Sequence, residues 1–234
     1  MIFTASYRAL LYLFTPQYRA IILKILGLTF IILVIIWLSA RQLFITYFWP
    51  WIAQFFPEIP NWAGWLGLSS LLIFNLGLAL LITFLIVPIT AMIGSFFIDA
   101  VAEIIEKKDY PNEPIGQTMP FGRSLILSLK FLLLSLCGNG IVLILFFVPA
   151  INLIAFYVIN GYLFGREYFA FAAYRFRSTQ DAHAFLQFHR ITVFGAGLLI
   201  AFFISIPVLN LVTPLFAATL MTNLHKMLSH HTPT

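Results

Sequence analysis

Charged side chains are scarce in this sequence of 234 residues: they make up 9% of it, whereas hydrophobic residues make up 62%. A typical soluble domain carries about 25% charged residues, so this chain lacks the polar side chains that a water-facing surface needs. The mean hydropathy is correspondingly high, at +0.99. This composition excludes a soluble globular fold and predicts an integral membrane protein.

Motifs that would indicate an enzyme or an ATP-driven pump are also missing. No glycine-rich phosphate loop follows a predicted strand, and no histidine pair has the spacing of a zinc site. The single cysteine, Cys137, permits no intrachain disulfide. We therefore expect no enzyme activity, no cofactor, no metal and no nucleic-acid partner. Residues 1–15 lack the ordered features of a cleavable signal peptide, and without a Gly/Ser-rich linker residues 1–234 are expected to form a single membrane domain.

Two apolar runs, residues 131–165 and 191–225, carry the most informative pattern. Each is about 35 residues long, which is short for two crossings of roughly 20 residues each plus a connection. Each is broken near its middle, by Pro-Ala-Ile-Asn-Leu at residues 149–153 and by Pro-Val-Leu-Asn-Leu at residues 207–211. We therefore predict an all-α membrane protein with two proline-broken re-entrant helical hairpins, residues 121–165 and 191–226. Asn152 and Asn210 are expected to satisfy backbone groups that the prolines free.

The remaining apolar segments predict surface and membrane-spanning helices. Helical spacing of apolar residues predicts an amphipathic helix over residues 1–15, ended by Pro16. Continuous apolar runs predict transmembrane helices at residues 20–40 and 66–87. Residues 88–107 are expected to continue the second of these as one amphipathic helix, with a kink allowed at Pro88. Between the two crossings, residues 42–65 are rich in aromatic side chains and are interpreted as an interfacial loop. This loop is either an aromatic belt or a functional surface, which would be the opening of a solute pathway or an interaction surface.

The polar side chains of the chain fall into a few groups. Asp99, Glu103 and Glu106 form an acidic stripe interpreted as solvated surface, in which Glu103 and Lys107 are an i,i+4 pair. The histidines near the carboxyl end are interpreted as a frayed tail. If both broken segments are hairpins, nearly all 13 lysines and arginines lie on one side, with only Arg41 clearly on the other. The positive-inside rule then places both termini in the cytoplasm.

The most suggestive local feature is the start of the first long apolar helix. Pro16 ends one helix, and Gln17, Tyr18 and Arg19 open the next, where unpaired backbone N–H groups and a guanidinium favour an anion. A lipid headgroup or plain interface anchoring would use the same features, so both interpretations stay open. Further pathway or interface candidates are basic or polar residues near the hairpins. They are Arg123, Lys130, Arg166, Asn152 and Asn210.

The order of these elements resembles that of the CysZ-type sulfate permeases. The amino-acid sequence is similar to that of the family at Val-Pro-Ile, residues 87–89, and at the two hairpin tips, residues 147–152 and 206–211. The stretch at residues 160–169 is more similar to a divergent branch of that superfamily. In the family, a Gly-x-Arg-Arg-like turn before the first long helix is associated with sulfate. Arg19 matches its first arginine, whereas Gln17 and Ala20 replace the glycine and the second arginine.

The resemblance implies a multi-pass channel or permease of the bacterial inner membrane. It would pass sulfate or a related oxyanion for cysteine synthesis, without ATP and as a homo-oligomer surrounded by membrane lipids. Gly138, Gly140, Gly195 and Gly197 would allow the close helix packing that covers mid-membrane backbone. The alternative is a non-transporting membrane scaffold or lipid-interacting protein, which the cationic surface and aromatic loop would also suit.

Overall fold

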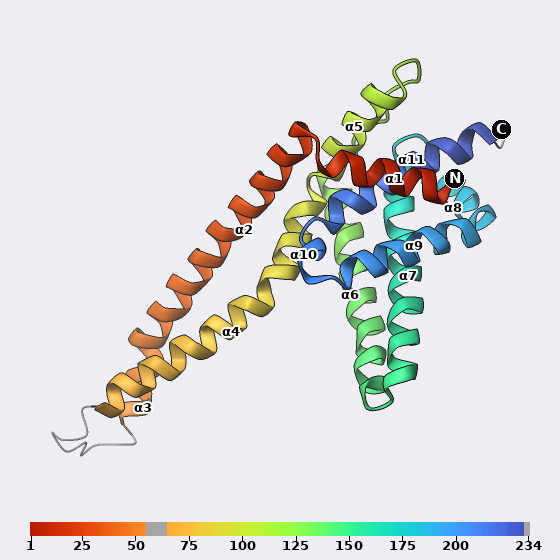
Figure 1. Cartoon of the computed structure of the whole chain (residues 1–234). Helices are drawn as coiled ribbons and strands as arrows, with labels where there is room; N and C mark the ends of the chain where they lie inside the picture. Colours follow the sequence, from red (N-terminus) through yellow and green to blue (C-terminus); the bar gives the residue numbers. More distant parts are fainter. Residues whose placement is uncertain (55–64, 232–234) are drawn as a thin grey trace. The chain divides into compact units, whose positions relative to one another are not determined.

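The structure, a computed structural model, describes residues 1–54 and 65–231 (Figure 1). In these ranges every regular element is helical, as the sequence predicts. The chain divides into two compact units, Leu23–Ile93 and the combination of Met1–Ile22 with Gly94–Thr234. The first unit holds most of two long helices and two short helical segments between them, and the second holds the two segments predicted to be hairpins and the remaining helices.

The unit Leu23–Ile93 is built from α2 (Pro16–Leu43) and α4 (Trp65–Ser95). The Thr29 and Thr90 hydroxyl groups lie 3.3 Å apart, and Phe44 stacks on Phe74 with ring centroids 3.8 Å apart. Residues early in one helix thus meet residues late in the other, so the two helices run antiparallel. The Thr29 hydroxyl also donates to the Ile25 carbonyl at 2.8 Å, so this buried polar group is satisfied.

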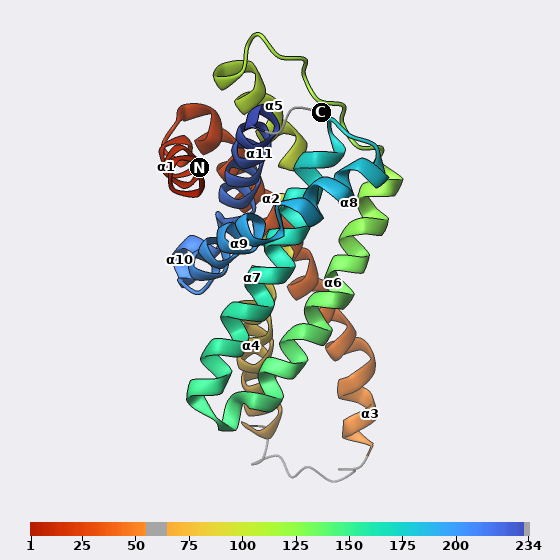
Figure 2. The same cartoon turned by 90° about the vertical axis from the view of Figure 1, so that its right-hand side faces the viewer.

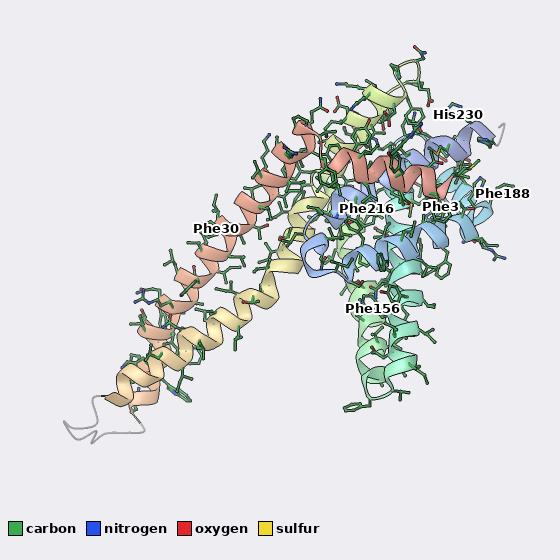
Figure 3. All side chains as sticks on the ribbon, in the orientation of Figure 1. Phe3, Phe30, Phe156, Phe188, Phe216 and His230 are labelled. Carbon is green, nitrogen blue, oxygen red and sulfur yellow. The ribbon has the colours of Figure 1, made fainter. Side chains whose placement is uncertain are left out.

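Two described helices are long and apolar enough to cross a membrane. They are the stretch Pro16–Trp51 and the segment Leu125–Val142 of α6 (Phe121–Ile144). The bent pair of α8 (Thr179–Phe188) and α9 (Arg190–Ile204) would be a third if it were one span. Side chains such as Phe30 are exposed along the first stretch, as a lipid-facing helix requires (Figure 3). The predicted crossing at residues 66–87 lies within α4.

The prediction of a loop at residues 42–65 is wrong for residues 42–53, which are helical. The chain continues from α2 through the π-helical η1 (Phe44–Phe48) into α3 (Trp49–Ala53). Pro50 is the second residue of α3. The rest of the aromatic segment, residues 55–64, lies outside the described residues, so both interpretations of it stay predictions.

The helix that follows Pro88 does not run unbroken to Lys107, which corrects the sequence prediction. Pro88 lies inside α4, and the break comes at Phe96 and Phe97, before α5 (Ile98–Asp109). The Phe97 N–H donates to the Gly94 carbonyl at 3.0 Å, a short turn that closes α4. The i,i+4 pair in α5 is confirmed, with Lys107 Nζ 2.6 Å from Glu103 Oε1.

Helix α11 (Thr213–His231) forms the centre of the larger unit. Its residues from Thr213 to Lys226 are all buried, and it contacts α1 (Ile2–Leu13), α5, α7 (Pro149–Tyr174) and α9 (Arg190–Ile204) (Figure 2). The prediction of a frayed histidine tail is wrong here. His225 is 2% exposed and stacks on Phe176, and His230 Nε2 lies 2.8 Å from Glu113 Oε1.

Both predicted proline breaks are present. Helix α6 gives way to the 3₁₀ turn η3 (Leu145–Phe147), and Pro149 then takes the first position of α7. Pro207 likewise opens the short α10 (Pro207–Asn210) between α9 and α11. The Asn152 amide donates to the Val142 carbonyl at 2.6 Å, so it satisfies a backbone group across the turn as expected. Among the described residues the Asn210 side chain has no such partner, which corrects the expectation there.

Glycines allow α7 and α9 to approach closely. A Cβ placed on Gly197 would lie 1.9 Å from the Gly161 carbonyl oxygen and 2.8 Å from the Gly165 Cα, so only glycine fits. Gly195 and Gly138 also face neighbours within the chain, near Ile2 and Ile159 respectively, whereas nothing lies within 4 Å of a Cβ at Gly140. Three of the four glycines singled out in the sequence therefore serve packing within one chain.

Candidate anion-binding site

The start of α2 follows directly from its local sequence. Helix α1 ends at Leu13, the Thr15 hydroxyl donates to the Tyr12 carbonyl at 2.7 Å, and Pro16 opens α2. Proline is well suited to the first helical position because its φ is preset and its missing N–H would be unpaired there. The first backbone hydrogen bond of α2 runs from the Arg19 N–H to the Thr15 carbonyl, at 3.0 Å.

One accessible backbone donor, the Gln17 N–H, and one guanidinium remain available at this helix start. Among the described residues, the N–H groups of Gln17 and Tyr18 have no hydrogen-bond acceptor. The Gln17 and Arg19 side chains are exposed, and no described carboxylate lies within 4 Å of Arg19. Free N–H groups at the positive end of a helix, beside an unpaired guanidinium, have the chemistry of an oxyanion site.

Tyr18 is buried as a whole residue, so it contributes neither its hydroxyl nor an accessible backbone N–H to this arrangement. The side chain is 0% exposed, its hydroxyl lies 2.8 Å from the Thr219 hydroxyl of α11, and its ring lies 5.2 Å from that of Tyr12. These contacts fix the first turn of α2 against α11. Sequence reasoning placed Tyr18 at this site but had no means of finding Thr219 as its partner.

A second polar cluster, which the sequence did not predict, surrounds Arg175 just after α7. Its guanidinium donates to Glu106 Oε1 at 2.8 Å and Oε2 at 3.1 Å, and it also contacts Asp99 and the Gly116 carbonyl. Burial opposes the charged guanidinium, but the hydrogen bonds and charge of Glu106, with those of Asp99, outweigh it and raise the Arg175 pKa. Arg175 is therefore a permanent cation enclosed between two carboxylates.

The acidic stripe on α5 is accordingly not solvated along its length, which corrects the sequence interpretation. The Glu106 side chain is 1% exposed, whereas the Asp99 side chain is 36% exposed. Glu106 also accepts the Gly116 N–H at 2.9 Å, and the Gln117 N–H donates to the Arg175 carbonyl at 2.9 Å. The cluster thus holds the loop after α5 against the end of α7. Asp99 and Glu106 are seven residues apart, and this shared helix face was the available signal.

Two more basic residues, Arg177 and Lys226, are engaged by neighbours. Arg177 lies 4.0 Å over the Phe185 ring and donates to Ser229 Oγ at 3.2 Å. Lys226 Nζ lies 2.7 Å from Glu113 Oε2 and 3.9 Å over the Phe176 ring. Neither cation is free to hold a solute without giving up these contacts.

In the part of the chain that the structure describes, no contact brings the pathway candidates together with Arg19. Lys130 on α6 and Arg166 on α7 are exposed, whereas the Arg123 side chain lies outside what the structure describes. Near them inside the first hairpin, Asn139 and Asn160 exchange amide hydrogen bonds of 3.3 and 3.2 Å between α6 and α7. A polar pair of this kind joins helices in an apolar environment.

Comparison with known proteins agrees with the architecture. A family model described as "Sulfate transporter CysZ/Etoposide-induced protein 2.4" matches residues 5–214, which is most of the chain. No curated protein matches it. The match covers the amphipathic α1, the start of α2, both proline breaks and the first residues of α11. The chain therefore belongs to the sulfate transporter CysZ/etoposide-induced protein 2.4 family.

Proposed function

We propose that this protein is a channel or permease of the bacterial inner membrane that passes sulfate or a related oxyanion for cysteine synthesis. Its termini lie in the cytoplasm, its two hairpins re-enter from that side, and copies of the chain assemble into a homo-oligomer. Family membership supports a transport role. The observation that carries the proposal is the exposed Arg19, which has no carboxylate partner among the described residues, at a helix start where the Gln17 N–H is also exposed and unpaired.

The chemistry of this site suits an oxyanion taken up reversibly from water. Arg19 presents a planar fork that can contact two oxygens of one anion, and the helix start adds the exposed Gln17 N–H. The site is exposed, so a bound anion keeps part of its hydration and can leave again. Gln17 replaces the family's glycine and Ala20 replaces its second arginine. We therefore propose an oxyanion selectivity broader than sulfate alone.

Replacing Arg19 with alanine should weaken oxyanion binding. A charge-assisted hydrogen bond contributes about 1.5–3 kcal/mol, so the affinity should fall roughly ten- to a hundred-fold. Arg19→Lys should restore only part of it, because an ammonium cannot make the two-oxygen contact. Binding is measured by calorimetry, and transport by flux of radiolabelled sulfate, with sulfite, thiosulfate and chloride as competitors, in liposomes that carry the pure protein.

Lys24→Ala is the matched control, because Lys24 is an exposed cation on the same helix, outside the site. An equal loss in Lys24→Ala would show that only diffuse positive charge attracts the anion. Liposomes that carry the folded parent protein but pass no tested anion would instead favour the non-transporting scaffold or lipid-interacting protein.

The proposed hairpin topology is tested by cysteine labelling. In a Cys137→Ser background, single cysteines at Ile151 and Leu209 should resist an impermeant maleimide added from the periplasm. Both positions flank the proline breaks, which a re-entrant hairpin keeps within the membrane. Gln42→Cys, at the far end of α2, should label readily and serves as the positive control. Rapid labelling of both hairpin positions would overturn this topology.

A further inference from the structure

Helix α1 has a small buried face and a large exposed apolar face. Ala5 and Ala9 are fully buried where α1 contacts α11. On the exposed side, Phe3 is 85% exposed and Phe14 is 70% exposed (Figure 3). An exposed apolar face on an amphipathic helix is the feature by which such helices lie in the membrane interface.

A pocket of about 450 Å³ adjoins this helix where α1 and the connection to α2 meet the end of α5. Arg8 and Lys108 supply two cations to its wall, and Asp109 supplies one carboxylate. The remaining lining residues are Leu11, Tyr12 and Thr15. Arg19 is not among the residues that line it, although Thr15, whose carbonyl accepts the Arg19 N–H, is.

The charges in the pocket are only partly balanced. The Tyr12 hydroxyl donates to Asp109 Oδ1 at 2.7 Å, and Arg8 Nη1 lies 3.9 Å from Oδ2, too far for a hydrogen bond. Lys108 Nζ lies 5.0 Å over the Tyr12 ring, and no described carboxylate lies within 4 Å of it. Two cations and one carboxylate leave a formal excess of one positive charge.

We propose that this pocket binds the phosphodiester of a membrane phospholipid, with Arg8 and Lys108 contacting phosphate oxygens. The acyl chains would then lie along the exposed apolar face of α1, beside Leu11 and Phe14. An excess of one positive charge matches the single negative charge of a phosphodiester. The nearby Asp109 carboxylate disfavours a doubly charged free anion such as sulfate.

The probe is dioctanoylphosphatidylglycerol, added to delipidated protein in detergent and counted as bound lipid by native mass spectrometry. Each basic residue near a membrane surface contributes about 1 kcal/mol to anionic lipid binding. Arg8→Gln with Lys108→Gln should therefore weaken apparent affinity roughly thirty-fold, and Lys108→Gln alone roughly five-fold. The single variant alters an exposed residue without an ion pair, so it tests the site even if the double variant does not fold.

The matched control is Lys107→Gln with Arg190→Gln, which makes the same charge change at exposed residues outside the pocket. It should bind the lipid as the parent does. An equal loss of lipid affinity in this control would show that only diffuse positive charge attracts the lipid. Displacement of the lipid by equimolar phosphate or sulfate would indicate a free-oxyanion site instead. Equal binding of dioctanoylglycerol, which has no phosphate, would show that only the apolar face matters. Unchanged lipid binding in Lys108→Gln and in the double variant would overturn the proposal.

Discussion

Replacing Arg175 with methionine is expected to lower the free energy of unfolding by about 3–5 kcal/mol, the cost of removing one partner of a buried ion pair. The change leaves Glu106, whose side chain is 1% exposed, with the Gly116 N–H as its one remaining hydrogen-bond donor among the described residues. The loop after α5 also loses the guanidinium contact to the Gly116 carbonyl. Unfolding is followed by circular dichroism in detergent, as a function of denaturant.

Two further variants separate charge from packing in this experiment. Arg166→Met removes an exposed arginine from α7 and should change stability by less than about 0.5 kcal/mol. Adding Glu106→Gln to Arg175→Met should recover part of the loss, since the uncompensated buried charge is gone. If Arg175→Met is as stable as the parent, or if Glu106→Gln recovers nothing, the ion pair does not hold this region together.

The Arg175 cluster shows where sequence reasoning ends. The sequence correctly paired Glu103 with Lys107, because residues four apart on a helix are always neighbours. Arg175 is separated from Glu106 by 69 positions, and nothing local selects it over Arg166 or Arg177 as the buried partner. With no visible partner, a carboxylate is naturally assigned to the surface.

Some of the helix breaks could likewise be predicted from local sequence, and others could not. Pro149 and Pro207 were correctly predicted to interrupt their helices, and each takes the first position of the next helix. Pro88 instead lies within α4, because neighbouring groups can satisfy the backbone that a proline frees in an apolar helix. The break at Phe96 and Phe97 follows Gly94, but a single glycine in an apolar helix can equally mark a packing contact, so it does not locate a break by itself.

The sequence position of the candidate anion site was predictable, but which of its residues are exposed was not. Pro16 and Arg19 mark a helix start through local chemistry, and the structure places that start where expected. The burial of Tyr18 depends on Thr219, 201 positions away, and so required the fold. The same holds for the glycines, whose small size predicts close packing without naming the helix against which they pack.

Replacing Gly197 with alanine is expected to destabilise the fold by about 3 kcal/mol, the upper part of the usual range for overpacking. The new Cβ would lie 1.9 Å from the Gly161 carbonyl oxygen, and backbone cannot rotate aside as a side chain can. Helices α7 and α9 would have to separate, which also opens gaps along the rest of their contact. Stability is measured as above, by circular dichroism in denaturant.

The sign of this effect is decisive because helix propensity acts in the opposite direction. Glycine to alanine within a helix normally stabilises by about 0.5–1 kcal/mol. Gly140→Ala should show that gain, because nothing lies within 4 Å of a Cβ there. Stabilisation by Gly197→Ala would mean that α7 and α9 do not cross at Gly161 and Gly165. A large loss in Gly140→Ala would mean that another surface packs against that glycine, which is the contact expected of a partner copy in a homo-oligomer.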